Sequence, residues 1–282
     1  MRKRPARKII ILVAVVVTSA ASACLDFGDL SGSSDAGESD DASIDASTDD
    51  ASTSDAAGDG GSDAAEDAPI AIVQSVANAV FGGPTSVSTV TPSPETRGNL
   101  NVVAISWQAD GYASAILSIT DTDGNTYELA VVSKNAAALG HAIYYAKNIN
   151  GGVKPNTVTI TTILQPGADS GADDPDVAIL EISGLDRVAP YETMNQASGS
   201  SATATSGNVI TVVPRSLLIT AGGVDYGNTF ADASTAFTLV PLTGESAWDL
   251  VGYQVVQSTG TYASSIPLPG SGLWVLQIAA FK

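Results

Sequence analysis

Two acidic runs have the residue types and spacing that could bind a metal ion. One is the segment Thr120-Asp-Thr-Asp-Gly-Asn125, and the other places four carboxylates within the eight residues 169–176. Calcium takes carboxylate and amide oxygens presented by a loop. The candidate ligands are Asp121, Asp123 and Asn125 in the first run and Asp173, Asp174 and Asp176 in the second. A plain hairpin turn explains the first run, and a solvated acidic loop is the favoured interpretation of the second. We therefore expect no cofactor, with calcium as the alternative.

Residues suited to catalysis are few. His141 is the single histidine, and it lies in a strand-like segment after Gly140, where a structural role is more common than a base activating a nucleophile. A glycosidase needs two carboxylates, which could come from Glu128, Glu181 and Glu245. Glu181 alternates with apolar neighbours, and we expect it to face outward from a strand. No catalytic residue is predicted, and a carbohydrate-active enzyme is the alternative.

Aromatic residues in the C-terminal third could bind a glycan. Rings stack on the apolar faces of sugars, and nearby acids and amides bind sugar hydroxyls. The candidates are Tyr226, Trp248 and Tyr253, which have Asp225, Asn228 and Asp249 close in sequence. These rings could equally fill a hydrophobic core.

Short apolar and β-branched runs from residue 69 onward predict the elements that carry these side chains. Gly, Asn, Asp, Pro or Ser separates the runs, and none has the period of a long amphipathic helix. Many short strands with frequent turns indicate a sandwich or barrel. We predict an all-β domain over 69–282, as a jelly-roll-like two-sheet sandwich. The alternative is two immunoglobulin-like sandwiches divided near 184–205. The predicted strands are Ile70–Ala77, Thr85–Thr91, Leu100–Trp107, Ala113–Thr120, Thr126–Ser133, His141–Lys147, Asn156–Ile163, Val177–Ser183, Asn208–Val213, Ser216–Ala221, Phe237–Val240, Trp248–Val256, Thr261–Ile266 and Leu273–Phe281.

Composition excludes several classes of protein. The 282 residues contain 12 Lys and Arg against 30 Asp and Glu, which argues against nucleic-acid binding. One cysteine cannot form a disulfide within the chain, and one cysteine with one histidine cannot complete a structural zinc site. The 44% hydrophobic content is too high for a chain that is disordered throughout.

The N-terminus has the order of a secretory signal peptide. Five basic residues precede the apolar run Ile9–Val17, and small residues follow up to Cys24. This run is shorter than the roughly 20 residues that a membrane-spanning helix needs. We therefore predict a signal peptide over residues 1–23.

The segment Ala21-Ser-Ala-Cys24 resembles the lipobox of bacterial lipoproteins, although that pattern most often has Leu where Ala21 stands. The resemblance implies that Cys24 receives a diacylglycerol thioether and fatty acyl chains such as palmitate, and becomes the mature N-terminus. Two or more chains anchor a protein stably in a membrane. Leu25 follows the cysteine, and by the same resemblance it implies the outer membrane of a two-membrane bacterium.

Residues 24–68 are predicted to be a disordered tether. Residues 25–68 contain 14 acids and no base, with the loose repeat Asp-Ala-Ser and no apolar periodicity. Like charges extend such a segment, and without an apolar periodicity it cannot form a packed core. Most of the formal charge of −18 therefore belongs to this tether.

The domain is also similar to modules of secreted bacterial proteins whose activity is not established. The similarity rests on Gly98–Trp107, Ile119–Tyr127, Ile143–Ala146, Ala178–Leu185 and the final Trp274 to Phe281. It supports the fold and secretion, not a function. We expect a lipid-anchored surface or periplasmic protein displaying a β-sandwich that binds a glycan or protein partner. The alternatives are a carbohydrate-active enzyme and a purely structural envelope component.

Overall fold

The computed structural model describes residues 68–80, 84–108, 115–134, 139–163, 173–225, 229–230, 236–242 and 249–282. The chain divides into two units, residues 1–57 and residues 58–282, and all described residues belong to the second. The predicted signal peptide, Cys24 and nearly all of the predicted tether therefore lie outside the described residues.

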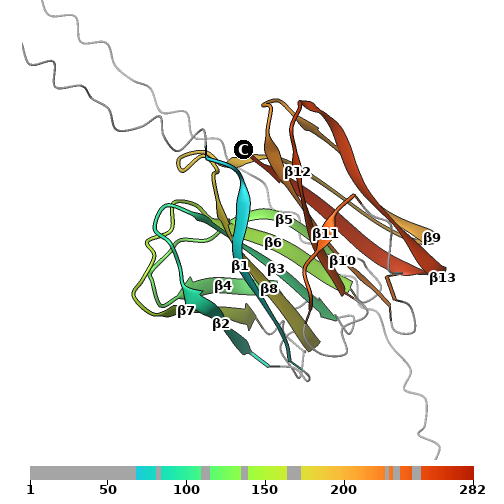
Figure 1. Cartoon of the computed structure of the whole chain (residues 1–282). Helices are drawn as coiled ribbons and strands as arrows, with labels where there is room; N and C mark the ends of the chain where they lie inside the picture. The colour runs from blue at the N-terminus through green and yellow to red at the C-terminus, as the bar shows by residue number, and fades with distance from the viewer. Residues whose placement is uncertain are drawn as a thin grey trace, which may run out of the picture. The chain divides into compact units, whose positions relative to one another are not determined.

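The described residues form strands and no helix, which confirms the predicted all-β class (Figure 1). Alternation of buried and exposed residues is clearest in β2, where Val87, Thr89 and Thr91 are buried between exposed neighbours. The strands are β1 Ala71–Ala79, β2 Ser86–Pro94, β3 Leu100–Gln108, β4 Ala115–Asp121, β5 Glu128–Lys134, β6 Leu139–Ala146, β7 Pro155–Ile163, β8 Asp173–Ser183, β9 Tyr191–Thr211, β10 Ser216–Val224, β11 Thr238–Leu239, β12 Asp249–Val256 and β13 Gly260–Phe281.

The first eight strands form a jelly-roll-like sandwich. Sheet A has the order β1-β8-β3-β6-β5 and sheet B the order β2-β7-β4, all antiparallel. This interleaving of early and late strands is the pattern of a jelly roll. The core between the two sheets contains Ile105, Trp107, Val158, Ile160 and Ile179. The predicted jelly-roll-like sandwich is thus formed by the first part of the domain.

The remaining strands form sheet C, in the order β11-β12-β10-β13-β9, which covers the other face of sheet A. Strand β10 is buried along its whole length. Leu217 and Ile219 face sheet A together with Phe281 of β13. The ring of Phe281 packs edge-on against Tyr145 and Tyr191, with centroids 5.5 and 6.1 Å apart.

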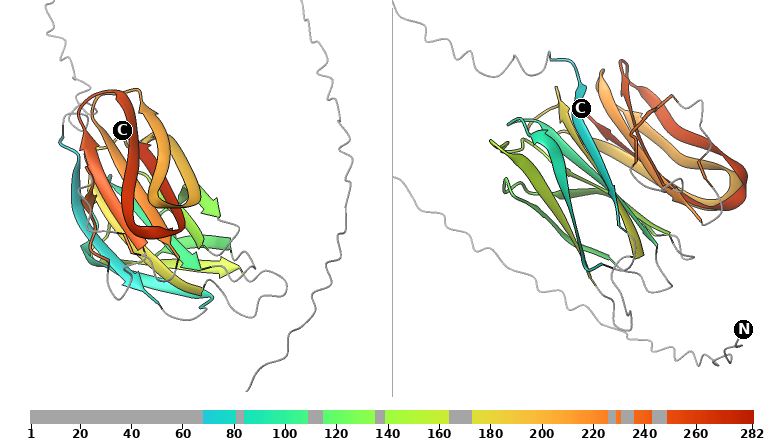
Figure 2. Two further views of the ribbon diagram at one scale, coloured as in Figure 1. Left: turned by 90° about the vertical axis from the view of Figure 1, so that its right-hand side faces the viewer. Right: turned by 60° about the horizontal axis from the view of Figure 1, so that its bottom comes forward.

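The long strands β9 and β13 pair with each other over nearly their whole length. Their register shifts at the bulge beside Gly207, which has φ of 74°, and again between Pro267 and Gly272. Beyond these points the β9–β13 ribbon bends back over the other strands of sheet C (Figure 2). There Val209 forms a core with Leu218 and Ile278. This ribbon explains why β10 is buried on both faces.

The region near 184–205 was predicted as a possible boundary between two sandwiches, and most of it is strand β9. Its run of Ser, Ala, Gly and Thr lacks the bulky residues typical of strands. Pairing with the apolar β13 places these small residues in a sheet. The two predicted strands Thr261–Ile266 and Leu273–Phe281 are likewise parts of one strand, β13.

Candidate functional site

A row of polar side chains crosses sheet A on the face covered by sheet C. In the strand register Ser133 lies opposite His141, His141 opposite Ser106, and Ser106 opposite Asp176. Directly opposite residues have Cβ atoms about 4.5–5.5 Å apart and point to the same face. Ile143, two residues after His141, lies in the core between sheets A and C, so the whole row faces sheet C.

Sheet C presents a second polar pair to this row. Gln196 of β9 lies opposite Gln277 of β13. The Ser133 hydroxyl donates a hydrogen bond to Gln196 Oε1. Gln277 Nε2 donates to the main-chain oxygen of His141 at 2.9 Å. The two sheets are therefore joined by a buried polar contact between Gln277 and His141 and by a second one at the edge strands β5 and β9, where Gln196 is exposed.

His141 is held neutral at this interface. The residue is 2% exposed, and burial lowers its pKa to about 4. Neither His141 Nδ1 nor Gln277 Oε1 meets the geometry of a hydrogen bond among the described residues, although the Gln277 side chain lies close enough to raise the pKa of His141 against the effect of burial. His141 is thus a neutral imidazole enclosed between two sheets, with the Gln277 side chain beside it.

Two carboxyl groups meet at the end of the same row. Asp249, the first residue of β12, hydrogen-bonds the carboxyl of Asp176 and the hydroxyl of Ser106. Burial, together with the negative charge of Asp176, raises the pKa of Asp249 well above its ordinary value. Because neighbouring negative charges repel each other, Asp249 keeps its proton and donates it in the hydrogen bond to the Asp176 carboxyl. The Ser106 hydroxyl is engaged by this pair, so Ser106, His141 and Asp176 do not form the hydrogen-bonded relay of a serine hydrolase.

A second buried carboxyl lies at the loop end of the jelly roll. Glu95 is 3% exposed and accepts hydrogen bonds from Asn101 Nδ2 and Asn156 Nδ2, each at 2.8 Å. Burial raises its pKa to about 7, against the effect of these hydrogen bonds, and the charges of Glu181 and Asp121 raise it further. The amide groups of Asn101 and Asn156 hold this carboxyl in the protein interior, so we assign Glu95 a structural role.

The first predicted calcium run is a loop in which protein donors occupy the carboxylate of Asp121. That carboxylate accepts hydrogen bonds from Asn125 N at 2.9 Å, Asn125 Nδ2 at 2.8 Å, Tyr127 Oη at 2.9 Å and Asn156 Nδ2 at 3.0 Å. Burial opposes ionisation of Asp121, but these bonds hold its pKa below the ordinary value. Asp123 lies two residues further along the same loop, and burial and the charge of Asp121 raise its pKa.

The second predicted calcium run is only partly within the described part of the structure. Asp176 belongs to the pair with Asp249, whereas the side chains of Asp173 and Asp174 are outside the described residues. Within the described ranges, no group of three or more His, Cys, Asp or Glu side chains is placed to hold a metal ion.

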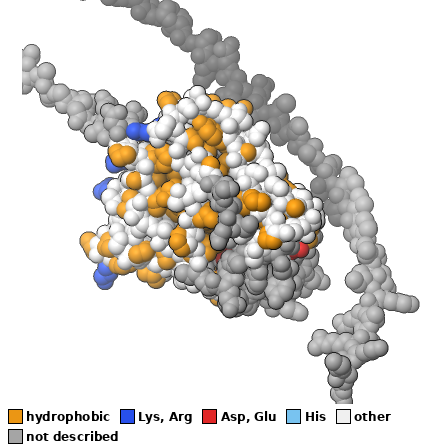
Figure 3. All heavy atoms as spheres, turned by 45° about the vertical axis from the view of Figure 1, so that its right-hand side comes forward, with side chains coloured by type: hydrophobic (Ala, Val, Ile, Leu, Met, Phe, Trp, Pro, Cys, Tyr) orange, Lys and Arg blue, Asp and Glu red, His pale blue; other side chains and the backbone are white. Residues whose placement is uncertain are grey.

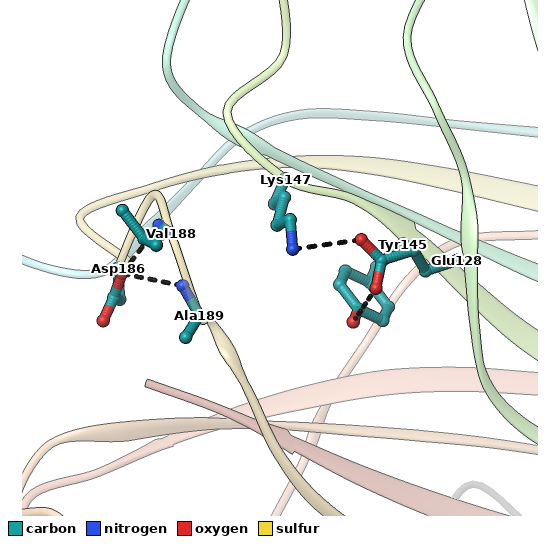
Figure 4. A network of polar contacts seen from close by, with 6 residues as sticks. All are labelled: Glu128, Tyr145, Lys147, Asp186, Val188 and Ala189. Carbon is teal, nitrogen blue, oxygen red and sulfur yellow. Dashed lines mark hydrogen bonds and ion pairs between the residues drawn. The ribbon is translucent and has the colours of Figure 1, made fainter. Parts of the chain in front are cut away.

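The predicted glycosidase carboxylates do not converge. Glu128 binds Lys147 Nζ at 3.1 Å and the Tyr145 hydroxyl at 2.8 Å, and these contacts lower its pKa (Figure 4). Three strand intervals separate β5 from β8 in sheet A, or about 14 Å, which exceeds the spacing of paired glycosidase acids. Glu128 and Glu181 also face opposite sides of that sheet, and Glu245 lies outside the described residues.

Glu181 does not face outward, and that prediction was wrong. It is 1% exposed and accepts hydrogen bonds from Gln74 Nε2 at 2.6 Å, Thr96 N at 2.8 Å and Asn99 Nδ2 at 2.6 Å. Its side chain points opposite to Leu180, as the alternation predicted, but that side of β8 is the inner face of the jelly roll. A nearby carboxylate, Asp186, similarly accepts main-chain bonds from Val188 N at 2.7 Å and Ala189 N at 3.0 Å (Figure 4).

Of the three predicted glycan-binding aromatics, the structure describes one. Tyr253 of β12 is half-buried and packs against the core between sheets A and C. Tyr226 and Trp248 lie outside the described residues, as does the predicted lipidation site Cys24.

Local sequence patterns do not predict a role for Ser133, Gln196 or Gln277, or the pairing of Asp249 with Asp176. One signal was present, because Gln277 interrupts an apolar run, Leu273-Trp-Val-Leu-Gln-Ile-Ala-Ala-Phe281. A polar residue in a run that is buried on both faces must find a partner inside the protein. Its partner, on β6, could not be identified without the packing of the two sheets.

Comparison of the chain with family models, with curated proteins and with solved structures gave no match in any of the three. Within the part of the chain that the structure describes, no helix is long and apolar enough to cross a membrane.

Proposed function

We propose that this chain is an exported lipoprotein, anchored through Cys24, whose β domain binds a neutral glycan at the cell envelope. The order of signal peptide, lipobox-like cysteine, acidic tether and sandwich supports export and anchoring. The acidic tether extends through charge repulsion and holds the domain away from the membrane.

A surface without charged side chains supports a neutral glycan as the ligand. Residues 193–214 and 250–281 contain no Asp, Glu, Lys, Arg or His, although the chain carries a net charge of −18. The outer ribbon face consists of the exposed cross-strand pairs Thr203–Pro267, Thr205–Ser265, Asn208–Ala263 and Ile210–Thr261. Figure 3 shows the side of the molecule that bears β9 and β13, where uncharged and hydrophobic side chains predominate.

The chemistry of this outer ribbon face fits a neutral sugar chain. Its hydroxyl and amide groups can exchange hydrogen bonds with sugar hydroxyls, and Ile210, 63% exposed, offers an apolar contact. An ionic ligand would leave its charge without a partner on these side chains. Interfaces are commonly depleted of charged residues at their centre.

A glycan array probed with the purified chain, with and without Ca²⁺, tests this proposal. We expect binding to neutral glycans that Ser265→Glu weakens at least tenfold, because the substitution places a charge in the centre of the face. Ser88→Glu on the exposed face of β2 is the matched control and should bind normally. A loss caused by Trp248→Ala but not by Ser265→Glu would move the site to the predicted aromatic residues. No binding to any glycan would contradict the proposal.

Anchoring has its own test. Labelling with a fatty-acid analogue in a bacterial host should depend on Cys24 and disappear in Cys24→Ala. Labelling that persists in this variant would refute lipidation at the cysteine.

The Asp176–Asp249 pair supports a second candidate function, a hydrolase. Burial raises the pKa of Asp249, and a carboxyl group that keeps its proton can act as a general acid beside a second carboxyl group. By exposed surface area, both residues keep some contact with solvent. Hydrolysis of a polysaccharide or peptide substrate that both Asp249→Asn and Asp176→Asn abolish would support it. Hydrolysis unaffected by either substitution would exclude this pair as the catalytic site.

A further inference from the structure

We propose that Ser133 and Gln196 form an intramolecular ester, which joins strand β5 of the jelly roll covalently to strand β9 of sheet C. The bond would close between residues 63 positions apart in the chain. This inference concerns a modification within the domain and does not depend on the proposed glycan binding.

The contact between the two reacting groups is already present. The Ser133 hydroxyl donates to Gln196 Oε1, and the amide carbon is one bond from that oxygen. Ser133 is only 2% exposed, so bulk water does not compete for its hydroxyl. Gln196 is exposed in part, which leaves its amide nitrogen a route to solvent. A hydroxyl held against a carbonyl group converts a slow bimolecular reaction into an intramolecular one.

His141 is placed to take the proton from Ser133. It lies directly opposite Ser133 in the register of β5 and β6, on the same face. Serine becomes a nucleophile when a neighbouring base accepts its proton. The imidazole is neutral, because burial lowers its pKa to about 4 against the opposing effect of the Gln277 side chain, and its Nδ1 meets the geometry of a hydrogen bond with no described residue.

Gln277 holds sheet C in place over β6, which keeps Gln196 beside Ser133. It lies opposite Gln196 on β13, and its amide donates to the His141 main-chain oxygen at 2.9 Å. It therefore fixes sheet C over β6 while Gln196 reaches Ser133. Gln277 is a positioning residue, since it does not contact the Ser133 hydroxyl.

The reaction balances without an oxidant or a second substrate. The Ser133 Oγ–Gln196 Cδ bond forms, and the Gln196 Cδ–Nε2 bond breaks. The hydroxyl proton passes through His141 to Nε2, which leaves as ammonia. The product is one ester and one ammonia from one hydroxyl and one amide. The single cysteine excludes a disulfide in this domain, and an ester would supply the covalent crosslink that a disulfide provides in other exported proteins.

Mass spectrometry of the purified, denatured chain tests the proposal. We expect the mass to be lower by one ammonia than the sequence requires. Trypsin should release peptides 98–134 and 188–215 as a single linked species, since no Lys or Arg lies inside either. Hydroxylamine, which cleaves esters, should separate them. A folded chain with the full mass and two separate peptides would overturn the proposal.

Matched variants assign the linkage to its residues. Ser133→Ala should have the full expected mass, and Ser133→Thr, which keeps the hydroxyl, should restore the loss. Ser106→Ala is the control, because Ser106 also lies opposite His141 but bonds Asp249. His141→Asn should slow ammonia loss after refolding. Loss that persists in Ser133→Ala, such as cyclisation of Asn150 before Gly151 within the tryptic peptide 148–187, would count against the ester.

Discussion

The substitution Glu95→Gln should abolish a specific pH dependence of stability. Glu95 is 3% exposed, and burial raises its pKa from 4.5 to about 7 in the folded protein. Below pH 4.5 the Glu95 carboxyl is protonated in both the folded and the unfolded state, so it adds no pH dependence to the free energy of unfolding. Between pH 4.5 and 7 the unfolded chain loses the proton first, so unfolding becomes progressively easier. Stability that is present at low pH is therefore lost as the pH rises.

The size of this loss follows from the two pKa values. Each pH unit between them lowers the free energy of unfolding by about 1.36 kcal/mol, so the full effect is about 3 kcal/mol. Glutamine has nearly the same shape and cannot ionise. Asn101, whose Oδ1 has no partner among the described residues, can accept a hydrogen bond from the new amide.

The measurement is the free energy of unfolding in urea, for both proteins, at intervals from pH 4.5 to 8. Other titrating groups affect both proteins equally, so the difference between them isolates Glu95. We expect this difference to change by about 3 kcal/mol in favour of Glu95→Gln over that range. If the difference in the free energy of unfolding between the two proteins stays constant with pH, burial does not raise the pKa of Glu95.

Three further predictions concern packing and charge in the same domain. His141→Gln should remove a loss of stability on acidification from pH 6.5 to 4, again about 3 kcal/mol in urea unfolding, because the buried imidazole stays neutral while the unfolded one gains a proton. Gly140→Ala should cost about 1–3 kcal/mol or more, since its Cβ would lie 2.1 Å from Cε2 of the buried Trp107, whereas Gly260→Ala meets only ordinary contacts at 3.4 Å. Phe281→Ala should lower the free energy of unfolding by about 3–5 kcal/mol, and Val188→Ala, at a position 78% exposed, by less than about 0.5 kcal/mol.

Much of the fold could be predicted from local patterns. Apolar runs separated by turn residues located most of the strands, and the absence of a helical period excluded helices from the described domain. The strand β9 was missed over Tyr191–Gly207, because Ser, Ala and Gly, which have weak strand preferences, separate its few strand-forming residues. Its pairing with β13 depends on a partner more than fifty residues away, which no local pattern contains.

Composition and short-range periodicity were enough to predict the all-β class and to exclude a disulfide within the chain, and they also predict an N-terminal signal, a lipidation site and an acidic tether. They carry no information on which polar residues meet. Ser133, His141 and Gln196 come from three strands in two sheets, and Asp176 meets Asp249 across the same interface. The reason is physical, because strand register and sheet packing bring together side chains whose separation in sequence carries no information about their contact.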